Sequence, residues 1–455
     1  MKAFDTENSV WARFSPEQRG QMETYSVHYR QFLDTARTER LANKEIIRQA
    51  ENAGFRTMAD FTSLKAGDKV YWDQKGKSVI LAVIGSDPIE KGLKIVGSHI
   101  DCPRLDVKAM PVVEKNKIVY FKTHYYGGLL KYQWVCLPLS LVGVVYKADG
   151  SRVDVSIGED PGDPVLFIND LLPHLGKDQA TKKLSEAISG EMLMPLAGTN
   201  GEGEKTKPAI LTLLKDKYGI EEEDFTSAEL EIIPAVKSRD VGLDRSMIMS
   251  HGHDDRVCSY ANLAAILDAA PGEKTQVALF ADKEEIGSVG NTGVHSSYFP
   301  DFIAELLSLQ GRDQEIWLRR TLRNSEVLSA DVCAAFDPVF ADAYEEQNSA
   351  KLGYGICLCK YTGARGKAGS NDANAEFMAK IRRIFNEKEV PWQVGELGKV
   401  DQGGGGTIAY IMADWGCDVV DCGVAMHSMH APLEIVAKAD AYSGYLAYKA
   451  FFESK

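Results

Sequence analysis

The chain has 455 residues, which is long enough for one very large domain or for two to three ordinary ones. Its composition, with 44% hydrophobic and 26% charged residues, is typical of a globular protein in water. The formal net charge of −13 argues against general binding to nucleic acid or to an anionic membrane, because both require a basic surface.

The first regular segment, residues 15–54, predicts two helices. Ser15 followed by proline is a good helix start, because proline is tolerated in the first turn. Apolar residues then recur at helical spacing, and a turn at 52–54 ends the second helix. Residues 69–85 instead predict two strands joined by a glycine-containing turn, with the second strand fully buried.

A buried strand in the segment 93–108 stops abruptly, and His99 and Asp101 follow it. A carboxylate two residues after a histidine suits a metal ligand whose second ring nitrogen is held in place. This pattern alone is weak evidence, since a satisfied surface histidine is the commoner explanation.

The segment 109–245 differs in character, because short runs with strand-like alternation dominate it. We interpret it as an inserted, mostly β domain that divides an α/β domain into residues 1–108 and 246–455. Its glycine-rich stretch 198–207 predicts a loop. That stretch lacks the lysine spacing of a phosphate loop, so nucleotide binding is unsupported.

The α/β pattern resumes near Met247 with the pair Asp254-Asp255 at the start of a predicted helix. These aspartates could complement the helix dipole or serve a site, and the sequence leaves both explanations open. Glu284 and Glu285 follow the apolar run 277–281. Neighbouring side chains on an extended backbone point to opposite sides, so one could hold a metal while the other handles a proton. A solvated acidic turn is the alternative.

Five segments share one arrangement, in which an apolar strand stops and Asp, Glu or His follows. They supply His99, Asp254, Glu284 with Glu285, Asp331, and His430. Ligands of open α/β sheets bind at the carboxyl ends of strands, so we expect these side chains to converge. Two histidines, a bridging aspartate and one further carboxylate per metal suit a pair of zinc-type ions about 3.5–4 Å apart.

The cysteines and the N-terminal sequence indicate in which cellular compartment the protein is located. Eight cysteines are scattered through apolar sequence, and only Cys357 and Cys359 lie close together. One residue separates them, unlike the two-residue gap of a zinc knuckle, so we expect reduced, buried cysteines. No signal core or run approaching about 18 apolar residues is present. These features predict a cytoplasmic protein.

The ordered set of motifs resembles the aspartyl aminopeptidase family of cocatalytic-zinc metallopeptidases. The matching segments include G-S-H-I-D-C-P-R-L-D-V-K, H-D-D-R-V-C-S-Y, D-K-E-E-I-G-S, S-A-D and S-M-H-A-P-L-E. The resemblance implies an α/β fold, namely a mixed-sheet α/β/α metallopeptidase domain with an inserted, mostly β oligomerisation domain. It also implies an aminopeptidase that removes the N-terminal residue, with Asp or Glu as candidates, from peptides with a free N-terminus.

The resemblance further implies a role for each site residue. His99 and Asp331 resemble ligands of one zinc, and Glu285 and His430 resemble ligands of the other. Asp254 resembles the carboxylate that bridges them. Two zinc ions per subunit are therefore expected, with cobalt or manganese as alternatives.

Three further residues resemble the family's catalytic groups. Glu284 resembles the general base, and Asp101 the partner of His99. His174 is similar to the family histidine that reaches a neighbouring subunit's site and stabilises the oxyanion. This similarity implies self-association into dimers and a tetrahedral dodecamer.

The chain departs from the family pattern at several positions, for instance at Phe336-Asp337-Pro338-Val339. Recognition of an acidic first residue needs placed cations, and the candidates are Lys360, Arg365 and Lys367, although a solvated basic turn is the alternative. A di-metal carboxypeptidase or deacylase on the same fold, and a non-catalytic oligomeric scaffold, are the rival interpretations.

Overall fold

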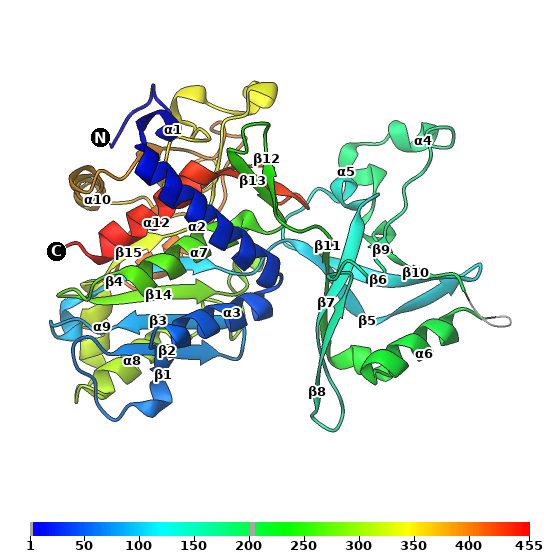
Figure 1. Cartoon of the computed structure of the whole chain (residues 1–455), viewed down its shortest axis with the longest axis horizontal. Coiled ribbons are helices and arrows are strands. Elements are labelled where there is room, and N and C mark those ends of the chain that lie inside the picture. Colours follow the sequence, from blue (N-terminus) through cyan, green and yellow to red (C-terminus); the bar gives the residue numbers. More distant parts are fainter. Residues whose placement is uncertain (1–2, 201–204) are drawn as a thin grey trace. The chain divides into compact units, whose positions relative to one another are not determined.

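The structure, a computed structural model, describes residues 3–200 and 205–455, and it divides into two compact units (Figure 1). The first unit comprises Met1–Asp101, Ser238–Met429 and Glu434–Lys455, and the second comprises Cys102–Lys237 and His430–Leu433. Residues 201–204 of the glycine-rich stretch predicted as a loop lie outside the described residues.

The first unit contains a nine-stranded mixed sheet. In spatial order its strands are β1 (Arg56–Thr57), β2 (Lys69–Gln74), β3 (Ser78–Val83), β14 (Thr275–Ala281), β4 (Leu93–His99), β15 (Glu326–Ser329), β19 (Asp418–Gly423), β17 (Ile356–Cys359) and β18 (Trp392–Val394). The four central strands β14, β4, β15 and β19 are parallel to one another. Their carboxyl ends therefore lie along one edge of the sheet.

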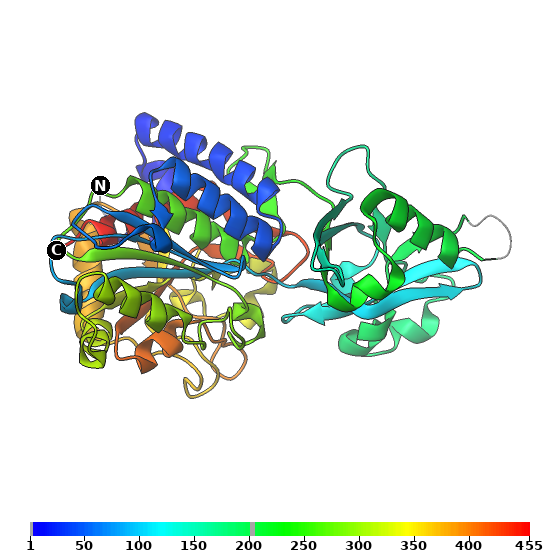
Figure 2. The same ribbon diagram turned by 90° about the horizontal axis from the view of Figure 1, so that it is seen from below.

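Helices cover both faces of this sheet, as Figure 2 shows. Successive strand residues point to opposite faces, so Val79 and Leu81 pack in one core and Ile80 and Ala82 in the other. The first core includes α2 (Pro16–Thr35), α3 (Glu39–Asn52), α7 (His253–Asp268), α10 (Ala375–Glu387) and α12 (Lys438–Phe452). The second includes α8 (Tyr298–Ser308), α9 (Glu315–Arg323) and α11 (Ala409–Asp414). The predicted α/β/α arrangement is confirmed.

The predicted helix start at Ser15 is also confirmed. The Ser15 hydroxyl accepts a hydrogen bond from the Gln18 backbone N–H, and the Gln18 side chain accepts one from the Ser15 N–H. This reciprocal capping box satisfies two amide donors that the first helical turn would otherwise leave unpaired.

A smaller five-stranded sheet also belongs to the first unit. Its strands, in spatial order, are β12 (Arg239–Val241), β13 (Met247–Ser250), β21 (Glu434–Ala437), β20 (Ala425–His427) and β16 (Cys333–Ala334). It takes strands from three distant parts of the chain, and β13 leads directly into α7.

The second unit is a seven-stranded antiparallel sheet with its own apolar core. The strand order is β11 (Ala228–Pro234), β5 (Arg104–Lys115), β6 (Ile118–Tyr126), β10 (Leu196–Gly198), β9 (Leu166–Phe167), β7 (Pro138–Tyr146) and β8 (Arg152–Ile157). Strand β11 also pairs with β7, and α6 (Lys207–Tyr218) packs on this unit. Its role in oligomerisation stays a prediction. Nowhere in residues 3–200 and 205–455 is a helix both long and apolar enough to cross a membrane.

Candidate active site

Three central parallel strands deliver predicted site residues to one edge of the large sheet. His99 is the last residue of β4, Asp331 follows the end of β15 by two residues, and Glu284 and Glu285 follow the end of β14. These strands are neighbours in the order β14-β4-β15 (Figure 1). The sequence prediction that these four side chains converge is therefore confirmed by the topology.

The expected origin of all five segments at strand ends of one open α/β sheet is wrong for Asp254 and for His430, which follows β20 of the five-stranded sheet. Asp254 follows β13, which belongs to the five-stranded sheet, and lies in the first turn of α7. Helix α7 packs against β4, so this turn still brings Asp254 to His99. A helix N-terminus, and not a strand end of the large sheet, positions the carboxylate.

His99 lies at the centre of the cluster. Its Nε2 atom is 3.2 Å from Asp254 Oδ1 and 3.6 Å from Asp331 Oδ1. Two sets of donor atoms each lie within 4.8 Å of one another, one in His99, Glu284 and Asp331, and the other in His99, Asp254 and Glu285. The two glutamates thus take different carboxylate neighbours.

Glu284 and Glu285 lie in a turn after β14 and not on the extended strand itself. The prediction that their side chains alternate along an extended backbone is therefore wrong. Strand β14 ends at Ala281, Lys283 is left-handed with φ 68°, and Glu284–Ile286 form a short 3₁₀ helix. The backbone N–H groups of Glu284 and Glu285 both donate to Asp101, at 3.1 and 3.2 Å. The segment is therefore a turn, which was the alternative interpretation of the sequence, but Asp101 holds it by two hydrogen bonds.

Asp101 joins the turn to the central histidine. It is fully buried, and its Oδ1 lies 3.3 Å from His99 Nδ1. Its backbone carbonyl is 3.0 Å from the same nitrogen. Held from this side, His99 presents Nε2 to Asp254 and Asp331, as a metal-ligating histidine requires.

Two supporting residues escaped the sequence analysis. Asp255 accepts a hydrogen bond from the His99 backbone N–H at 3.3 Å, and Glu434 accepts one from the Asp254 N–H at 3.1 Å. Both side chains are buried. Asp255 stood in the quoted Asp-Asp pair, and Glu434 ended the quoted S-M-H-A-P-L-E segment, but neither carried a signal of its partner.

The crowding of carboxylates shows in the acid–base properties of the cluster. Burial, followed by repulsion from Asp331, raises the pKa of Glu284 to about 8. Burial also raises the pKa of Asp331 and of Asp255. Burial opposes charge on His99, but the surrounding carboxylates outweigh it and raise its pKa well above the usual value. Such a group of buried acids calls for a compensating cation.

The donor set fits zinc. Two ligand atoms that each lie about 2.1 Å from a tetrahedral zinc are about 3.4 Å apart. The observed separations of 3.2 and 3.6 Å around His99 Nε2 bracket that value. Imidazole nitrogen and carboxylate oxygen are both zinc ligands, and a carboxylate with two oxygens is able to bridge two ions.

The remaining predicted residues belong to the second unit or to a basic loop. His430 is grouped with the second unit, where its Nδ1 lies 2.5 Å from the Gly128 carbonyl oxygen, and His174 is exposed there. Lys360 and Lys367 both pair with Asp372, at 2.6 and 3.0 Å. The roles of these residues stay predictions.

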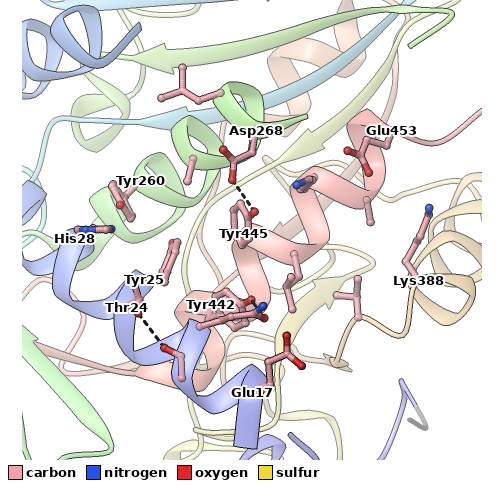
Figure 3. Close-up of a pocket in the computed structure, with 18 of the residues that line it drawn as sticks. Glu17, Thr24, Tyr25, His28, Tyr260, Asp268, Lys388, Tyr442, Tyr445 and Glu453 are labelled. Carbon is pink, nitrogen blue, oxygen red and sulfur yellow. Dashed lines mark hydrogen bonds between the residues drawn. The ribbon is translucent and has the colours of Figure 1, made fainter. Parts of the chain in front are cut away.

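A separate cavity of about 1000 Å³ lies among α2, α7 and α12 (Figure 3). Tyr25, Tyr260, Tyr442 and Tyr445 line it, and the Tyr445 hydroxyl donates to Asp268 at 2.8 Å. None of the predicted site residues, all of which the structure describes, lines this cavity. The His99 cluster is therefore the candidate active site.

Comparison with known proteins gives consistent matches. A family model described as aminopeptidase I zinc metalloprotease (M18) matches residues 32–452. Relatives named "Probable M18 family aminopeptidase 1" from Clostridium acetobutylicum and Thermotoga maritima are 48% and 47% identical, each over 98% of both chains.

Solved structures agree with this match. A crystal structure of an M18 family aminopeptidase from Thermotoga maritima has a TM-score of 0.95 at 46% identity, covering 98% of this chain and 99% of that chain. Aminopeptidase I from Clostridium acetobutylicum has a TM-score of 0.91 at 43% identity, covering 99% and 100%. A structure described as the S. cerevisiae mApe1 dodecamer, at 18% identity and a TM-score of 0.76 over 95% and 97%, shares the fold alone.

Proposed function

Because this chain belongs to the M18 family of zinc aminopeptidases, it is a zinc-dependent aminopeptidase, and we propose that two zinc ions occupy the His99 cluster. The proposal assigns His99 and Asp331 to one ion, Glu285 and His430 to the other, and Asp254 to both. His430 enters on the sequence resemblance alone. The observation that carries the proposal is the cluster of four carboxylates around His99, whose donor atoms form sets within 4.8 Å of one another.

Glu284 is the proposed general base. When bound, zinc supplies Lewis-acid chemistry, since it makes water more acidic and polarises the peptide carbonyl. Glu284 accepts a proton from the attacking water and donates it to the leaving amine. Its carboxylate belongs to the donor set with His99 and Asp331, which supports its reach to a water at the cluster.

Asp101 is the proposed positioning residue for this chemistry. It contacts His99 Nδ1 and accepts both N–H groups of the glutamate turn. One carboxylate thus orients a metal ligand and the base together. The substrate's free α-amino group would sit by the metals and acidic ligands of the cluster, which limits cleavage to the first residue.

Self-association is proposed as part of the site. The relative described as a dodecamer shares the fold, which supports assembly of this chain into dimers and a tetrahedral dodecamer. His174, exposed on the second unit, is proposed to reach the site of a neighbouring subunit and to stabilise the oxyanion. The cytoplasm stays the proposed location.

Acidic substrates are a finer part of the proposal. An Asp or Glu at the first position requires a cation from the basic loop, where Asp372 already pairs with Lys360 and Lys367. A panel of aminoacyl-nitroanilides with Asp, Glu, Ala and Leu tests this. Faster hydrolysis of the Asp and Glu substrates would support a preference for acidic residues. Faster hydrolysis of the Ala and Leu substrates would refute it.

The central experiment removes all metal and reloads zinc. We expect activity to return as two ions bind per chain, and to disappear when the substrate's amine is acetylated. The Glu284→Gln variant should bind zinc normally but lose about 10²–10⁴-fold in kcat. Glu305→Gln, at an exposed position of α8, is the control. Rapid hydrolysis of N-blocked peptides would instead indicate a carboxypeptidase or deacylase.

A further inference from the structure

Three thiols from two segments of the chain converge in the first unit, outside the His99 cluster. Cys359 Sγ lies 3.7 Å from Cys357 Sγ and 3.6 Å from Cys333 Sγ. All three sulfur atoms lie within 4.8 Å of one another. The residues are buried, with exposed fractions of 0% for Cys357, 5% for Cys333 and 7% for Cys359.

These separations match the edge lengths of a thiolate metal site. Sulfur atoms that each lie about 2.3 Å from one tetrahedral zinc are about 3.8 Å apart. The separations are far longer than a disulfide bond, which is about 2.05 Å. One ion can therefore contact all three sulfurs with little movement of the side chains.

The backbone around the thiols is built to bring them together. Cys357 and Cys359 share one face of β17, because they are two residues apart on a strand. Gly423 lies opposite Cys357 on β19, and a Cβ there would fall 1.5 Å from the Asp331 carbonyl oxygen. Glycine at this position lets the chain after Asp331 lie against the strands, which delivers Cys333 to the other thiols.

A second glycine closes the cluster from another side. A Cβ at Gly395 would lie 2.6 Å from Cys357 Sγ and 3.0 Å from Cys333 Sγ. The backbone at Gly395 therefore approaches two of the sulfurs more closely than any side chain would permit. The thiols thus lie in a confined space that excludes bulk water.

A buried carboxylate lies near the thiols. Asp421 lies opposite Cys359 in the antiparallel β17–β19 pair, so both side chains are on the same face. Its carboxylate accepts hydrogen bonds from the Thr407 hydroxyl, at 2.6 Å, and from the Ser329 side chain. Asp421 is only 4% exposed. A bound cation would offset the repulsion between this buried carboxylate and the nearby Cys333.

We propose that Cys333, Cys357 and Cys359 bind one thiophilic d¹⁰ metal ion, either Zn²⁺ or Cu⁺. Thiolates favour both ions. Binding displaces the thiol protons, which leave to solvent. The ion would connect β16 to β17, and so fix the segment that begins at Asp331. Its function is structural, and it is additional to the zinc of the His99 cluster.

Cobalt titration of the full-length, metal-free protein tests the proposal. Co²⁺ bound by thiolates gives a strong sulfur-to-metal charge-transfer band in the near ultraviolet, which histidine and carboxylate ligands do not give. We expect this band to saturate at one equivalent per chain in reduced wild-type protein. Displacement of the band by Zn²⁺ and by Cu⁺, in separate titrations, identifies the preferred ion.

Two matched variants show which cysteines give rise to the charge-transfer band. Cys359→Ser should abolish it, whereas Cys417→Ser should retain it, because Cys417 is similarly buried, at 8% exposed, but packs in a different core. Absence of the band in wild-type protein would overturn the proposal, whatever the variants do. Loss of the band in Cys417→Ser, or its retention in Cys359→Ser, would also overturn it. Peptidase activity does not enter this readout, so the result is independent of the proposed function.

Discussion

Replacing Asp101 by asparagine is the sharpest test of how the site is held together. The carboxylate accepts the N–H groups of Glu284 and Glu285 and contacts His99 Nδ1. An amide keeps one acceptor oxygen and replaces the other with a donor, so one of the two N–H groups loses its partner. The side chain is fully buried, and water cannot compensate.

The magnitude follows from that single lost interaction. A hydrogen bond to a charged group contributes about 1.5–3 kcal/mol, which corresponds to about 10- to 150-fold in an equilibrium or rate constant. Loss of a partner that orients a metal ligand typically costs about 10–100-fold in metal affinity or activity. We therefore expect Asp101→Asn to lower kcat/KM by about 10–100-fold and to weaken zinc binding.

The assay is hydrolysis of an aminoacyl-nitroanilide over a range of free zinc concentrations, with bound zinc measured in parallel. Asp440→Asn is the matched control, because Asp440 is also fully buried and accepts two backbone N–H groups, from Gly353 and Gly355, at 2.6 and 2.7 Å. It should lose stability without losing zinc affinity. If Asp101→Asn kept wild-type zinc affinity and kcat/KM, the positioning role would be refuted.

Three further predictions concern stability. Burial opposes the charge on Glu326, but the lysines at 94, 380 and 274 outweigh it and lower its pKa from 4.5 to about 2. Its contribution to stability is therefore present above about pH 4.5 and is lost as the pH falls towards 2, so Glu326→Gln should flatten the pH dependence of the unfolding free energy there. An unfolding free energy that falls as steeply below pH 4.5 in the variant as in the wild type would contradict this. Gly395→Ala should destabilise by about 1–3 kcal/mol in urea unfolding, because its Cβ would overlap two sulfurs; a neutral result would mean that the strands shift freely. Ser15→Ala should cost about 0.5–2 kcal/mol through loss of the helix cap, whereas the exposed Ser308→Ala should cost little.

The sequence alone predicted those site residues that follow the ends of strands in the large sheet. Apolar runs that stop before His99, Glu284 and Asp331 are local features, and parallel packing of their strands brings these ends together. The glutamate turn was only an alternative interpretation of the sequence, and the hydrogen bonds that Asp101 makes to it could not be predicted because they join distant segments.

The sequence could not predict which sheet the strand before Asp254 joins. Nothing near Asp254 distinguishes a strand of the large sheet from one of the small sheet, because membership depends on pairing between β13 and β21, almost 190 residues later. The sequence also did not predict that Cys333, Cys357 and Cys359 come together. The spacing of Cys357 and Cys359 argued against a metal motif, and Cys333 joins them only through the close approach at Gly423.

The origin of the ligands in two sheets has a thermodynamic consequence. His99 and Asp331 follow strands of the nine-stranded sheet, whereas Asp254 follows a strand of the five-stranded sheet. A chain in which either sheet is unfolded therefore lacks part of the proposed donor set, so zinc would bind the fully formed first unit in preference to any partly folded state. By mass action, zinc at 100 times its dissociation constant would add about 2.7 kcal/mol to the stability of that unit. Zinc supply would thus regulate how long the folded chain survives as well as how fast it works.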